Sequence, residues 1–368
     1  MLHVVGDSKF GGGSVIISQI VVAQKEKGYD VSVLTTDREF ISHLQSKGIN
    51  THHVDCIWRS YNLFKDVLGV FRLVTFLNRD EFDVVHTHTT KAGFIGRIAG
   101  RISGCKNIFH TVHGFPFSEN SSLLKVRIFA IIEKFLARFT HRLIFVSDYH
   151  RKWAKDLGII SNNSNAISIR NGVNAPSISG DKVKVLKEKF GNKISIVFVG
   201  RIVREKGVFD LLHAFSILKD SIKGAQLFFV GDGPDFEKLK DEACGEDGVY
   251  LTGFVKNPAD YLTLADIFVL PSYREGLSIS ALEAQALGVP SILSNVGGNI
   301  EISDNGKSAL IFDVGCISAL VQKLSCLLSD EKLCERLRLS SNENFNDNFT
   351  SEKMTTEYNN LCEEIQTK

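Results

Sequence analysis

The chain has 368 residues, enough for two domains that each bury a core of their own. Its 43% hydrophobic and 23% charged residues are ordinary for a soluble globular protein and exclude the disordered and fibrous classes. The formal net charge of +1 hides an asymmetry, because residues 1–170 carry an excess of basic residues and the remainder an excess of acidic ones. Since no segment resembles a nucleic-acid-binding module, a basic half predicts an anionic membrane surface as partner.

Cysteine content and the first residues predict the compartment. Seven cysteines form no CxxC pair, and their odd number argues against a disulfide framework, so we expect a reducing environment. Residues 2–6 indicate a short strand that runs into polar residues and glycines, which is not a signal peptide. No apolar run is long enough to span a bilayer. We therefore expect a cytoplasmic protein, peripheral on the inner face of the plasma membrane.

Strands and helices alternate through the first half of the chain. The expected strands are residues 2–6, 31–35, 50–54, 83–86, 143–147 and 167–170, and the expected helices are 15–24, 40–46 and 64–77. Alternation at these lengths predicts a parallel sheet with helices on both faces. Ligands bind such sheets at the carboxyl ends of the strands.

A run of glycines lies between the first strand and the first helix. Gly11, Gly12 and Gly13 let the backbone come close to a ligand at a helix N-terminus. Their spacing is not Gly-x-Gly-x-x-Gly, and no acidic residue ends the next strand as a dinucleotide site requires, so an NAD enzyme is disfavoured. A plain tight turn is an equally open interpretation.

Two histidine-containing segments follow strands. His86, His88 and Lys91 lie in the first, and His113 and Phe115 lie in the second. The pair His86-x-His88 would suit a metal ion, but no third ligand accompanies it at a suitable spacing, so we expect no metal site. We expect side chains that line a binding site instead. For His113 the alternative is a turn histidine bonded to the backbone.

Residues 122–142 are predicted to form a helix in which basic and large apolar side chains are intermixed. Such a helix suits the headgroup region of an anionic bilayer, where each Lys or Arg contributes on the order of 1 kcal/mol. The alternative is a core helix packed on the sheet. The basic charge of the whole half favours membrane contact.

The second half begins after a polar segment, residues 176–193, that we expect to be a linker. The expected strands are 194–200, 227–231, 249–255, 267–270, 291–294 and 309–312, and the expected helices are 208–218, 317–328, 331–339 and 350–365. Arg201 and Lys206 lie between the first of these strands and its helix. Two cations at this spacing suit the two phosphates of a nucleoside diphosphate, the arginine as a fork and the lysine as a point charge. By themselves they would indicate only a solvated charge run.

The most informative stretch, residues 271–290, is predicted to be a loop followed by a helix. Glu275 lies in the loop, and Glu283 lies a turn or two inside the helix. Backbone amides at the helix start attract an anion, and we expect them to be those of Gly276, Leu277 and Ser278. A phosphate flanked by two carboxylates suggests a sugar nucleotide. The alternative is that Glu275 only solvates the loop and that Ser280 and Glu283 form a capping box.

These residues carry a resemblance to a known family. Glu275 and Glu283 resemble the Glu-x7-Glu motif of retaining glycosyltransferases with the GT-B fold, and the flanking Pro-Ser-x-x-Glu-Gly-Leu and Glu-Ala-x-Ala-x-Gly-x-Pro resemble family 4. Gly-Arg-x4-Lys-Gly at 200–207 resembles the diphosphate-binding loop of that family. His-Gly-Phe-Pro at 113–116 resembles a loop of the members that build bacterial surface polysaccharides. The resemblance covers nearly the whole chain and is strongest in 194–300.

The resemblance implies an α/β architecture, GT-B, in which two Rossmann-like domains with parallel sheets face each other across a cleft. Residues 1–175 would form the acceptor-binding domain, 176–193 the linker and 194–348 the nucleotide-sugar donor domain. A last helix, 349–368, would return to the N-terminal domain.

It also implies an activity, that of a retaining hexosyltransferase. A hexose or N-acetylhexosamine would pass from a nucleoside diphosphate sugar to a polyprenyl-diphosphate-linked glycan in bacterial surface polysaccharide synthesis. The family resemblance implies UDP as the nucleotide of the donor. No Asp-x-Asp metal-diphosphate signature is present, so we expect no cofactor and no metal. A transferase with a soluble acceptor and a catalytically silent sugar-nucleotide-binding protein are the alternatives.

The resemblance assigns roles to individual residues. Glu275 would accept hydrogen bonds from hydroxyls of the transferred sugar, Glu283 from the ribose, and His113 would line the sugar. The expected catalytic residues are Glu275, His113, Arg201 and Lys206; the expected donor-binding residues are Arg201, Lys206, Glu283, Gly276, Leu277, Ser278, Phe254, Val255, Gly12 and Gly13; and the expected acceptor-binding residues are His86, His88, Lys91 and Phe115.

Overall fold

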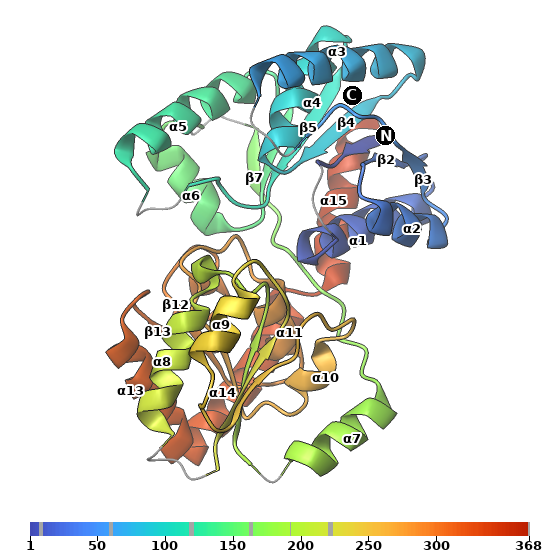
Figure 1. Cartoon of the computed structure of the whole chain (residues 1–368). Coiled ribbons are helices and arrows are strands. Elements are labelled where there is room, and N and C mark those ends of the chain that lie inside the picture. Colours follow the sequence, from blue (N-terminus) through green and yellow to red (C-terminus); the bar gives the residue numbers. More distant parts are fainter. Residues whose placement is uncertain are drawn as a thin grey trace. The chain divides into compact units, whose positions relative to one another are not determined.

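The computed structural model describes residues 1–6, 10–58, 62–117, 121–161, 165–191, 193–219 and 224–366. These residues form two compact units (Figure 1). The first unit combines Met1–Gly172 with Ser351–Lys368, and the second is Val173–Thr350. Each unit is built on its own parallel sheet with helices packed against it.

The described part of the first unit has a seven-stranded sheet in the order β3-β2-β1-β4-β5-β6-β7. Its strands are β1 (Leu2–Val4), β2 (Ser32–Leu34), β3 (Asn50–His52), β4 (Val84–His88), β5 (Asn107–Val112), β6 (Arg142–Phe145) and β7 (Ala166–Ser168). Its helices are α1 (Gly12–Glu26), α2 (Arg38–Ser46), α3 (Leu63–Arg79), α4 (Thr90–Ile102), α5 (Leu123–Ala137), α6 (Asp148–Asp156) and α15 (Ser351–Gln366). The last helix packs on α1, although more than 300 residues separate them in the chain (Figure 1).

Side chains of β1 and of Val5, the next residue in the chain, pack alternately on the two faces of this sheet. Val4 packs on one face with Leu73 of α3 and Ile95 of α4. Val5 packs on the other face with Val21 of α1. Because successive strand residues point to opposite faces, His3 lies on the same face as Val5, beneath α1. A polar side chain is thereby placed inside the molecule.

The sequence patterns do not indicate α4 or α6 and give no bounds for β5, and α4 shows the physical reason. Its glycines lower helix propensity, yet the structure needs them. A Cβ at Gly93 would lie 2.3 Å from Cε1 of His110, and one at Gly96 would lie 2.4 Å from Cγ2 of Thr87. The glycines therefore let the helix pack closely on β4 and β5, a tertiary requirement that no local pattern contains.

The described part of the second unit has a six-stranded parallel sheet in the order β10-β9-β8-β11-β12-β13. Its strands are β8 (Ser195–Val199), β9 (Gln226–Val230), β10 (Val249–Leu251), β11 (Ile267–Leu270), β12 (Ser291–Ser294) and β13 (Leu310–Phe312). Its helices are α7 (Gly180–Phe190), the short 3-10 helix η1 (Arg204–Lys206), α8 (Val208–Leu218), α9 (Phe236–Glu242), α10 (Ala259–Leu262), α11 (Ile279–Ala286), α12 (Asn299–Ile302), α13 (Ile317–Ser329) and α14 (Glu331–Asn348).

The segment expected to be a linker, 176–193, differs from that expectation because it contains α7 and belongs to the second unit. Before α7, the Ser179 amide donates to Oδ1 of Asp260 at 2.9 Å, and within it Lys182 Nζ lies 3.4 Å from the same carboxylate. Asn192 lies outside the described residues. The polar composition that suggests a linker is the solvent-facing side of a helix that buries only Leu186.

Both sheets have a point at which the order of strands reverses. In the first unit it lies between β1 and β4, and in the second between β8 and β11. Connections leave such a pair of strands toward opposite sides, which opens a crevice at their carboxyl ends where open α/β sheets bind ligands. Arg201 and Lys206 follow β8, Glu275 follows β11 and the glycine run follows β1. Other expected site residues lie elsewhere: His86 and His88 are within β4, and His113 and Phe254 follow β5 and β10.

Candidate active site

The ion pair between Lys206 and Glu275 lies at the strand reversal of the second unit. Glu275 follows β11, and Lys206 ends η1, which follows the neighbouring strand β8. The Lys206 Nζ donates to Oε1 of Glu275 at 2.6 Å. The Glu275 side chain is 7% exposed and the Lys206 side chain 27%, so the cation compensates a nearly buried carboxylate while part of it faces solvent.

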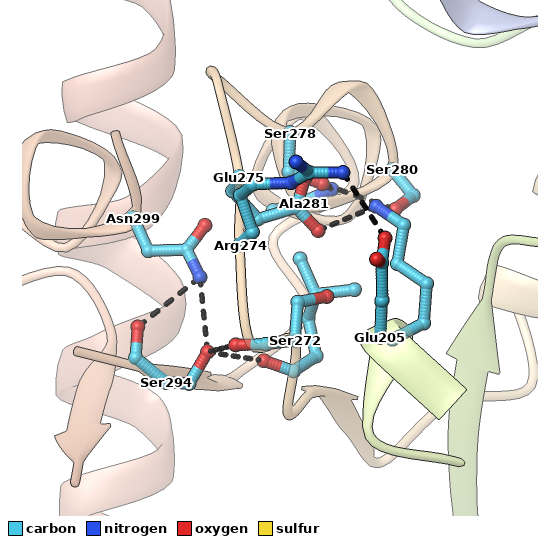
Figure 2. A network of polar contacts seen from close by, with 11 residues as sticks. Glu205, Ser272, Arg274, Glu275, Ser278, Ser280, Ala281, Ser294 and Asn299 are labelled. Carbon is cyan, nitrogen blue, oxygen red and sulfur yellow. Dashed lines mark hydrogen bonds and ion pairs between the residues drawn. The ribbon is translucent and has the colours of Figure 1, made fainter. Parts of the chain in front are cut away.

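The two loops that carry this pair are held together by backbone contacts. The Tyr273 amide donates to the Glu205 carbonyl at 2.8 Å. The Arg274 side chain pairs with the Glu205 carboxylate at 3.1 Å (Figure 2). Gly207 adopts a left-handed conformation with φ of 70°, and a Cβ there would lie 2.1 Å from the Pro271 carbonyl oxygen. The glycine in Lys-Gly is therefore required for the approach of the lysine to Glu275.

The other side of the Glu275 loop is fastened to the loop after β12. Ser294 Oγ donates to the Ser272 carbonyl at 2.6 Å, and Asn299 Nδ2 donates to the Ser294 carbonyl at 3.1 Å (Figure 2). The Gly298 amide donates to the Gly276 carbonyl at 3.0 Å, and a Cβ at Gly298 would lie 2.2 Å from that oxygen. Glu275 is thus positioned by rigid contacts on both flanks.

The helix after Glu275 begins later than expected. Helix α11 starts at Ile279, and Ser278 is its N-cap, with Oγ accepting from the Ala281 amide at 3.4 Å. Gly276 and Leu277 directly precede the helix and Ser278 caps it, so the three amides lie beside its start rather than inside its first turn, and their part in binding an anion stays a prediction. The physical reason is that the Gly276 carbonyl is committed to the loop after β12, which delays helical geometry until the serine cap.

Glu283 lies inside α11 as a half-buried carboxyl. The capping-box alternative is wrong, because the N-cap is Ser278 rather than Ser280. Among the described residues, the Glu283 carboxyl has no hydrogen-bond or ion-pair partner. Desolvation by burial raises its pKa to about 7. A carboxyl that is short of partners and close to its titration point is available to bind a ligand.

The remaining donor-site candidates of the second unit lie at the carboxyl ends of its strands. Arg201 directly follows the glycine after β8, is exposed, and has no side-chain partner in the part of the chain that the structure describes. Phe254 and Val255 follow the edge strand β10, and the Phe254 ring is 72% exposed. These residues therefore lie at the sheet edge that also carries Glu275.

In the first unit, Gly12 and Gly13 form the exposed first turn of α1, which begins at Gly12 rather than at Val15. Gly11 precedes the helix in extended backbone. The glycine run is therefore the exposed N-terminus of a helix that follows β1, and its part in binding the donor stays a prediction.

Histidines gather on the face of the first sheet that α1 and α15 cover. The register pairs His3 of β1 with His86 of β4, and His88 lies two residues further along the same face. Nδ1 of His3 lies 3.0 Å from Nε2 of His88, and Nδ1 of His88 lies 3.2 Å from Nε2 of His113, just beyond β5. Sequence reasoning missed His3, although a histidine inside an otherwise apolar strand is the signal that could have found it.

The expected acceptor-binding side chains are largely occupied by contacts within the first unit, although Phe115 also lines a small pocket. His86 and His88 are fully buried, because alternate residues of β4 point beneath α1 and α15. Lys91 forms an ion pair with Asp66 of α3 at 2.9 Å. Phe115 is buried in the aromatic core beside α5 and α6. Any part that His86 and His88 play in binding is indirect in this conformation, and the roles of Lys91 and Phe115 stay predictions.

His113 differs from these residues because it reaches a pocket. It is half-buried, and it lines a small pocket of the first unit together with Thr89, Thr90, His110, Val112, Gly114, Phe115, Pro116 and Glu133. Glu133 is held in place by Arg97, whose Nη2 lies 3.0 and 2.8 Å from the two carboxylate oxygens. Burial lowers the His113 pKa to about 4, so the ring is neutral near pH 7.

Three comparisons relate the chain to known proteins. It is 29% identical over 318 residues, 83% of this chain and 81% of the relative, to UDP-Gal:alpha-D-GlcNAc-diphosphoundecaprenol alpha-1,3-galactosyltransferase of Escherichia coli. It is 27% identical over 365 residues, 94% and 93% of the two chains, to the capsular polysaccharide biosynthesis glycosyltransferase CapM of Staphylococcus aureus. The crystal structure of Anabaena Alr3699/HepE in complex with UDP and glucose matches with a TM-score of 0.83 at 17% identity and covers 98% of this chain and 99% of that one.

Family models account for both units. Residues 10–175 match the model described as Glycosyltransferase Family 4, and residues 181–343 match the model described as Glycosyl transferases group 1. The two parallel-sheet units and the solved structure that they match confirm the predicted α/β architecture of two Rossmann-like domains. The chain belongs to the family 4 glycosyltransferases of group 1 and has the GT-B fold.

Proposed function

We propose that the protein is a retaining, metal-independent glycosyltransferase that uses a UDP-sugar and a lipid-linked glycan acceptor in bacterial surface polysaccharide synthesis. The observation that carries the proposal is the pair of Lys206 and Glu275 at the strand reversal of the second unit. The names of the relatives support the substrate classes: one uses UDP-Gal and a diphosphoundecaprenol-linked sugar, and another serves capsular polysaccharide synthesis. The matching crystal structure of HepE is a complex with UDP and glucose, which supports UDP as the nucleotide.

The donor diphosphate binds to cations that the second unit supplies. The exposed Arg201 and the solvent-facing part of Lys206 contact its phosphates, and the amides before and at the start of α11 add donors. Glu275 then accepts hydrogen bonds from hydroxyls of the sugar, and Glu283 from the ribose. Phe254 and Val255 lie beside the base. Protein charge placed where the leaving diphosphate becomes more negative stabilises the transition state, and we propose that it does so without a metal.

The chemical step is a substitution at the anomeric carbon with retained configuration. The acceptor hydroxyl oxygen forms a bond to this carbon while the bond from the carbon to the diphosphate oxygen breaks. The hydroxyl proton passes to the departing phosphate oxygen on the same face. The products are the glycoside and the nucleoside diphosphate. Arg201 and Lys206 act on the leaving group, and His113 accepts a hydrogen bond from a substrate hydroxyl.

Helix α5 supports contact with a membrane. It buries Ala130, Glu133 and Leu136 against the first unit and leaves its other face uncovered, which argues against the core-helix alternative. That face exposes large apolar residues, namely Leu123, Leu124, Ile128, Ile131 and Phe135, and basic residues, namely Lys125, Arg127, Lys134 and Arg138. Large apolar side chains among cations match the interface of an anionic bilayer.

Helix α3 adds a second exposed apolar set that sequence reasoning did not single out: Leu63, Phe64, Val67, Leu68 and Phe71. Both helices pack on α4. Among the described residues, no helix combines the length and the apolar character that crossing a bilayer requires. We propose that the enzyme docks peripherally on the cytoplasmic face of the plasma membrane, where a polyprenyl-linked acceptor is embedded.

Release of nucleotide from a panel of UDP- and GDP-sugars tests the proposal, measured with and without polyprenyl-diphosphate-linked sugars in detergent. We expect release with one donor, stimulation by the lipid-linked acceptor, and loss in Glu275→Ala and Lys206→Ala. If only water-soluble sugars stimulate release, the acceptor is soluble and the lipid-linked part of the proposal is wrong. Binding of nucleotide without release from any donor would make the protein a silent sugar-nucleotide-binding protein.

Two further measurements test the remaining parts of the proposal. The anomeric configuration of the product tests retention, and a chelator tests metal independence. We expect an α-linked product from an α-linked donor, measured by NMR of the isolated glycan, and full activity in the presence of EDTA. An inverted product, or activity that EDTA abolishes and a divalent cation restores, would refute the corresponding part.

A further inference from the structure

A continuous row of hydrogen bonds crosses the interior of the first unit. Oε1 of Gln24 in α1 lies 2.8 Å from Nε2 of His3. The other ring nitrogen of His3, Nδ1, lies 3.0 Å from Nε2 of His88. His88 in turn contacts His113 at 3.2 Å. We call these four residues the histidine row. It begins beneath α1 and α15 and ends at the pocket that His113 lines.

The three rings of the row are neutral near pH 7. Burial lowers the pKa of His3 to about 3 and that of His113 to about 4, and it lowers the pKa of His88 well below its ordinary value. A neutral imidazole has one N–H donor and one acceptor nitrogen. Each ring in the row can therefore donate a hydrogen bond to only one of its two neighbours and must accept one from the other.

The amide of Gln24 fixes that direction. Its Nε2 donates to Sγ of Cys362 at 3.5 Å, which leaves Oε1 facing His3. A carbonyl oxygen only accepts, so the proton of His3 is on Nε2 and its Nδ1 is the acceptor. His88 must then donate from Nε2 and accept at Nδ1, and His113 must donate from Nε2.

We propose that Gln24, acting through His3 and His88, is a positioning residue that holds His113 as the Nε2–H tautomer with a bare Nδ1. In the part of the chain that the structure describes, Nδ1 of His113 has no partner, so it is the acceptor that the ring offers to the pocket. The consequence for catalysis rests on the proposed function: a substrate hydroxyl can donate to His113, whereas a ligand carbonyl cannot pair with this nitrogen.

A metal ion is the competing explanation for buried histidines. One ligand nitrogen from each of His3, His86 and His88 lies within 4.8 Å of the others, which supplies the third ligand that sequence spacing did not reveal. In the structure, however, His3 Nδ1 and His88 Nε2 bond to each other, and His86 Nε2 bonds to Thr111 at 2.8 Å. Of the ring nitrogens of these three described histidines, only Nδ1 of His86 is buried without a partner. The hydrogen-bond pattern therefore favours neutral rings over a metal.

Histidine tautomers can be read directly by long-range 1H–15N correlation spectra of the full-length protein with 15N-labelled histidine at pH 7. We expect His3, His88 and His113 each to show a protonated Nε2 and a bare Nδ1. A protonated Nδ1 on His113 would overturn the proposal, because it requires the whole row to donate in the opposite direction. Stoichiometric zinc in the purified protein, with EDTA-sensitive shifts of His86 and His88, would overturn it in favour of the metal.

Variants at the start of the row test whether Gln24 is the cause. A carboxylate can only accept, so Gln24→Glu should keep the Nε2–H form of His113, whereas Gln24→Met should give His113 a mixture of both tautomers. Gln19→Met is the matched control on α1, because Gln19 has no hydrogen bond to the row. If Gln24→Met fails to fold, the wild-type and Gln24→Glu spectra still decide. An unchanged His113 spectrum in folded Gln24→Met would refute control by Gln24.

Activity separates this inference from the proposed function. If the protein transfers sugar, Gln24→Met should lower kcat/KM by about tenfold while Gln24→Glu retains it, since one hydrogen bond to the substrate is weakened. If no donor reacts but the tautomers are as expected, the proposed function fails and the inference holds. If transfer occurs and His113 carries its proton on Nδ1, the inference fails and the proposed function holds.

Discussion

Glu283 should make stability depend on pH near neutrality. Its pKa is about 7 in the folded protein, against an ordinary value of 4.5. Between these values the folded protein keeps a proton that the unfolded chain has lost, so the contribution of this carboxyl to stability falls as pH rises through that window. Glu283→Gln has no titrating carboxyl at this position, so it should not show this decrease in stability with rising pH. We expect the variant to match the wild type near pH 4.5 and to exceed it by on the order of 1 to 3 kcal/mol above pH 7.

Urea unfolding of both proteins at several pH values from 4.5 to 8 measures this difference. The exposed Glu352→Gln is the control and should give a difference that does not change with pH. Parallel curves for Glu283→Gln and the wild type would show that the carboxyl is not desolvated.

The pair of Lys206 and Glu275 should show strong thermodynamic coupling. Lys206→Met leaves a nearly buried carboxylate without its cation, and because the lysine is partly exposed we expect a cost of about 1 to 3 kcal/mol. Adding Glu275→Gln should recover most of this loss, since the unpaired charge is then gone.

A double-mutant cycle by urea unfolding measures that coupling. Arg274→Met with Glu205→Gln is the matched control, because this neighbouring pair is exposed and should couple by less than about 1 kcal/mol. Equal coupling energies in the two cycles would contradict the conclusion that burial of Glu275 makes its pair with Lys206 stronger than the exposed pair.

The role of a single residue could be predicted where the residue belongs to a motif within a short segment of the chain. Glu275 and Lys206 were found because each lies in a dense local motif, although their direct contact was not foreseen. Gln24 was missed because nothing near it marks a site, and His3 was missed although a histidine in an apolar strand is unusual. Only the register of β1 beside β4, and the packing of α1 over both, bring them to the buried histidines.

At the scale of elements, α5 should bind anionic membranes through its uncovered face. Ile131→Ser with Phe135→Ser removes two large exposed side chains whose burial in the interface stabilises binding by roughly 1.5 to 3 kcal/mol each. We expect at least a tenfold loss of affinity for phosphatidylglycerol vesicles in co-sedimentation.

The control for α5 is Ile217→Ser with Leu339→Ser, which removes two similarly exposed apolar residues from the second unit. This control should bind as the wild type does. Equal loss in both double variants, or equally strong binding to uncharged phosphatidylcholine vesicles, would show that α5 is not a specific membrane contact.

Elements with a strong local pattern were predicted closely. The helix α8 and the strands β11 and β12 have the expected bounds, since apolar runs between glycine and proline leave few alternatives. Helix α4 was missed because its glycines serve packing on the sheet. Helix α7 was taken for a linker because a mostly solvated helix has the composition of one.

For the whole molecule, alternation of strands and helices was enough to predict two parallel sheets. It did not give the order of the strands, which decides where the reversals lie and hence which loops meet. Lys206 and Glu275 are neighbours because β8 lies beside β11. Long-range pairing of this kind depends on the whole fold, and the family resemblance supplied what local physics could not.

The last helix should stabilise the first unit although it follows the second in the chain. Tyr358 of α15 is buried there, with its hydroxyl 3.2 Å from Thr111 Oγ1. Tyr358→Ala should cost about 3 to 5 kcal/mol and lower the unfolding midpoint by roughly 6 to 15 °C. Both tryptophans, Trp58 and Trp153, lie in the first unit, so their fluorescence reports its unfolding. The exposed Thr356→Ala is the control and should leave the midpoint unchanged; the same midpoint in Tyr358→Ala would mean that α15 is not part of this core.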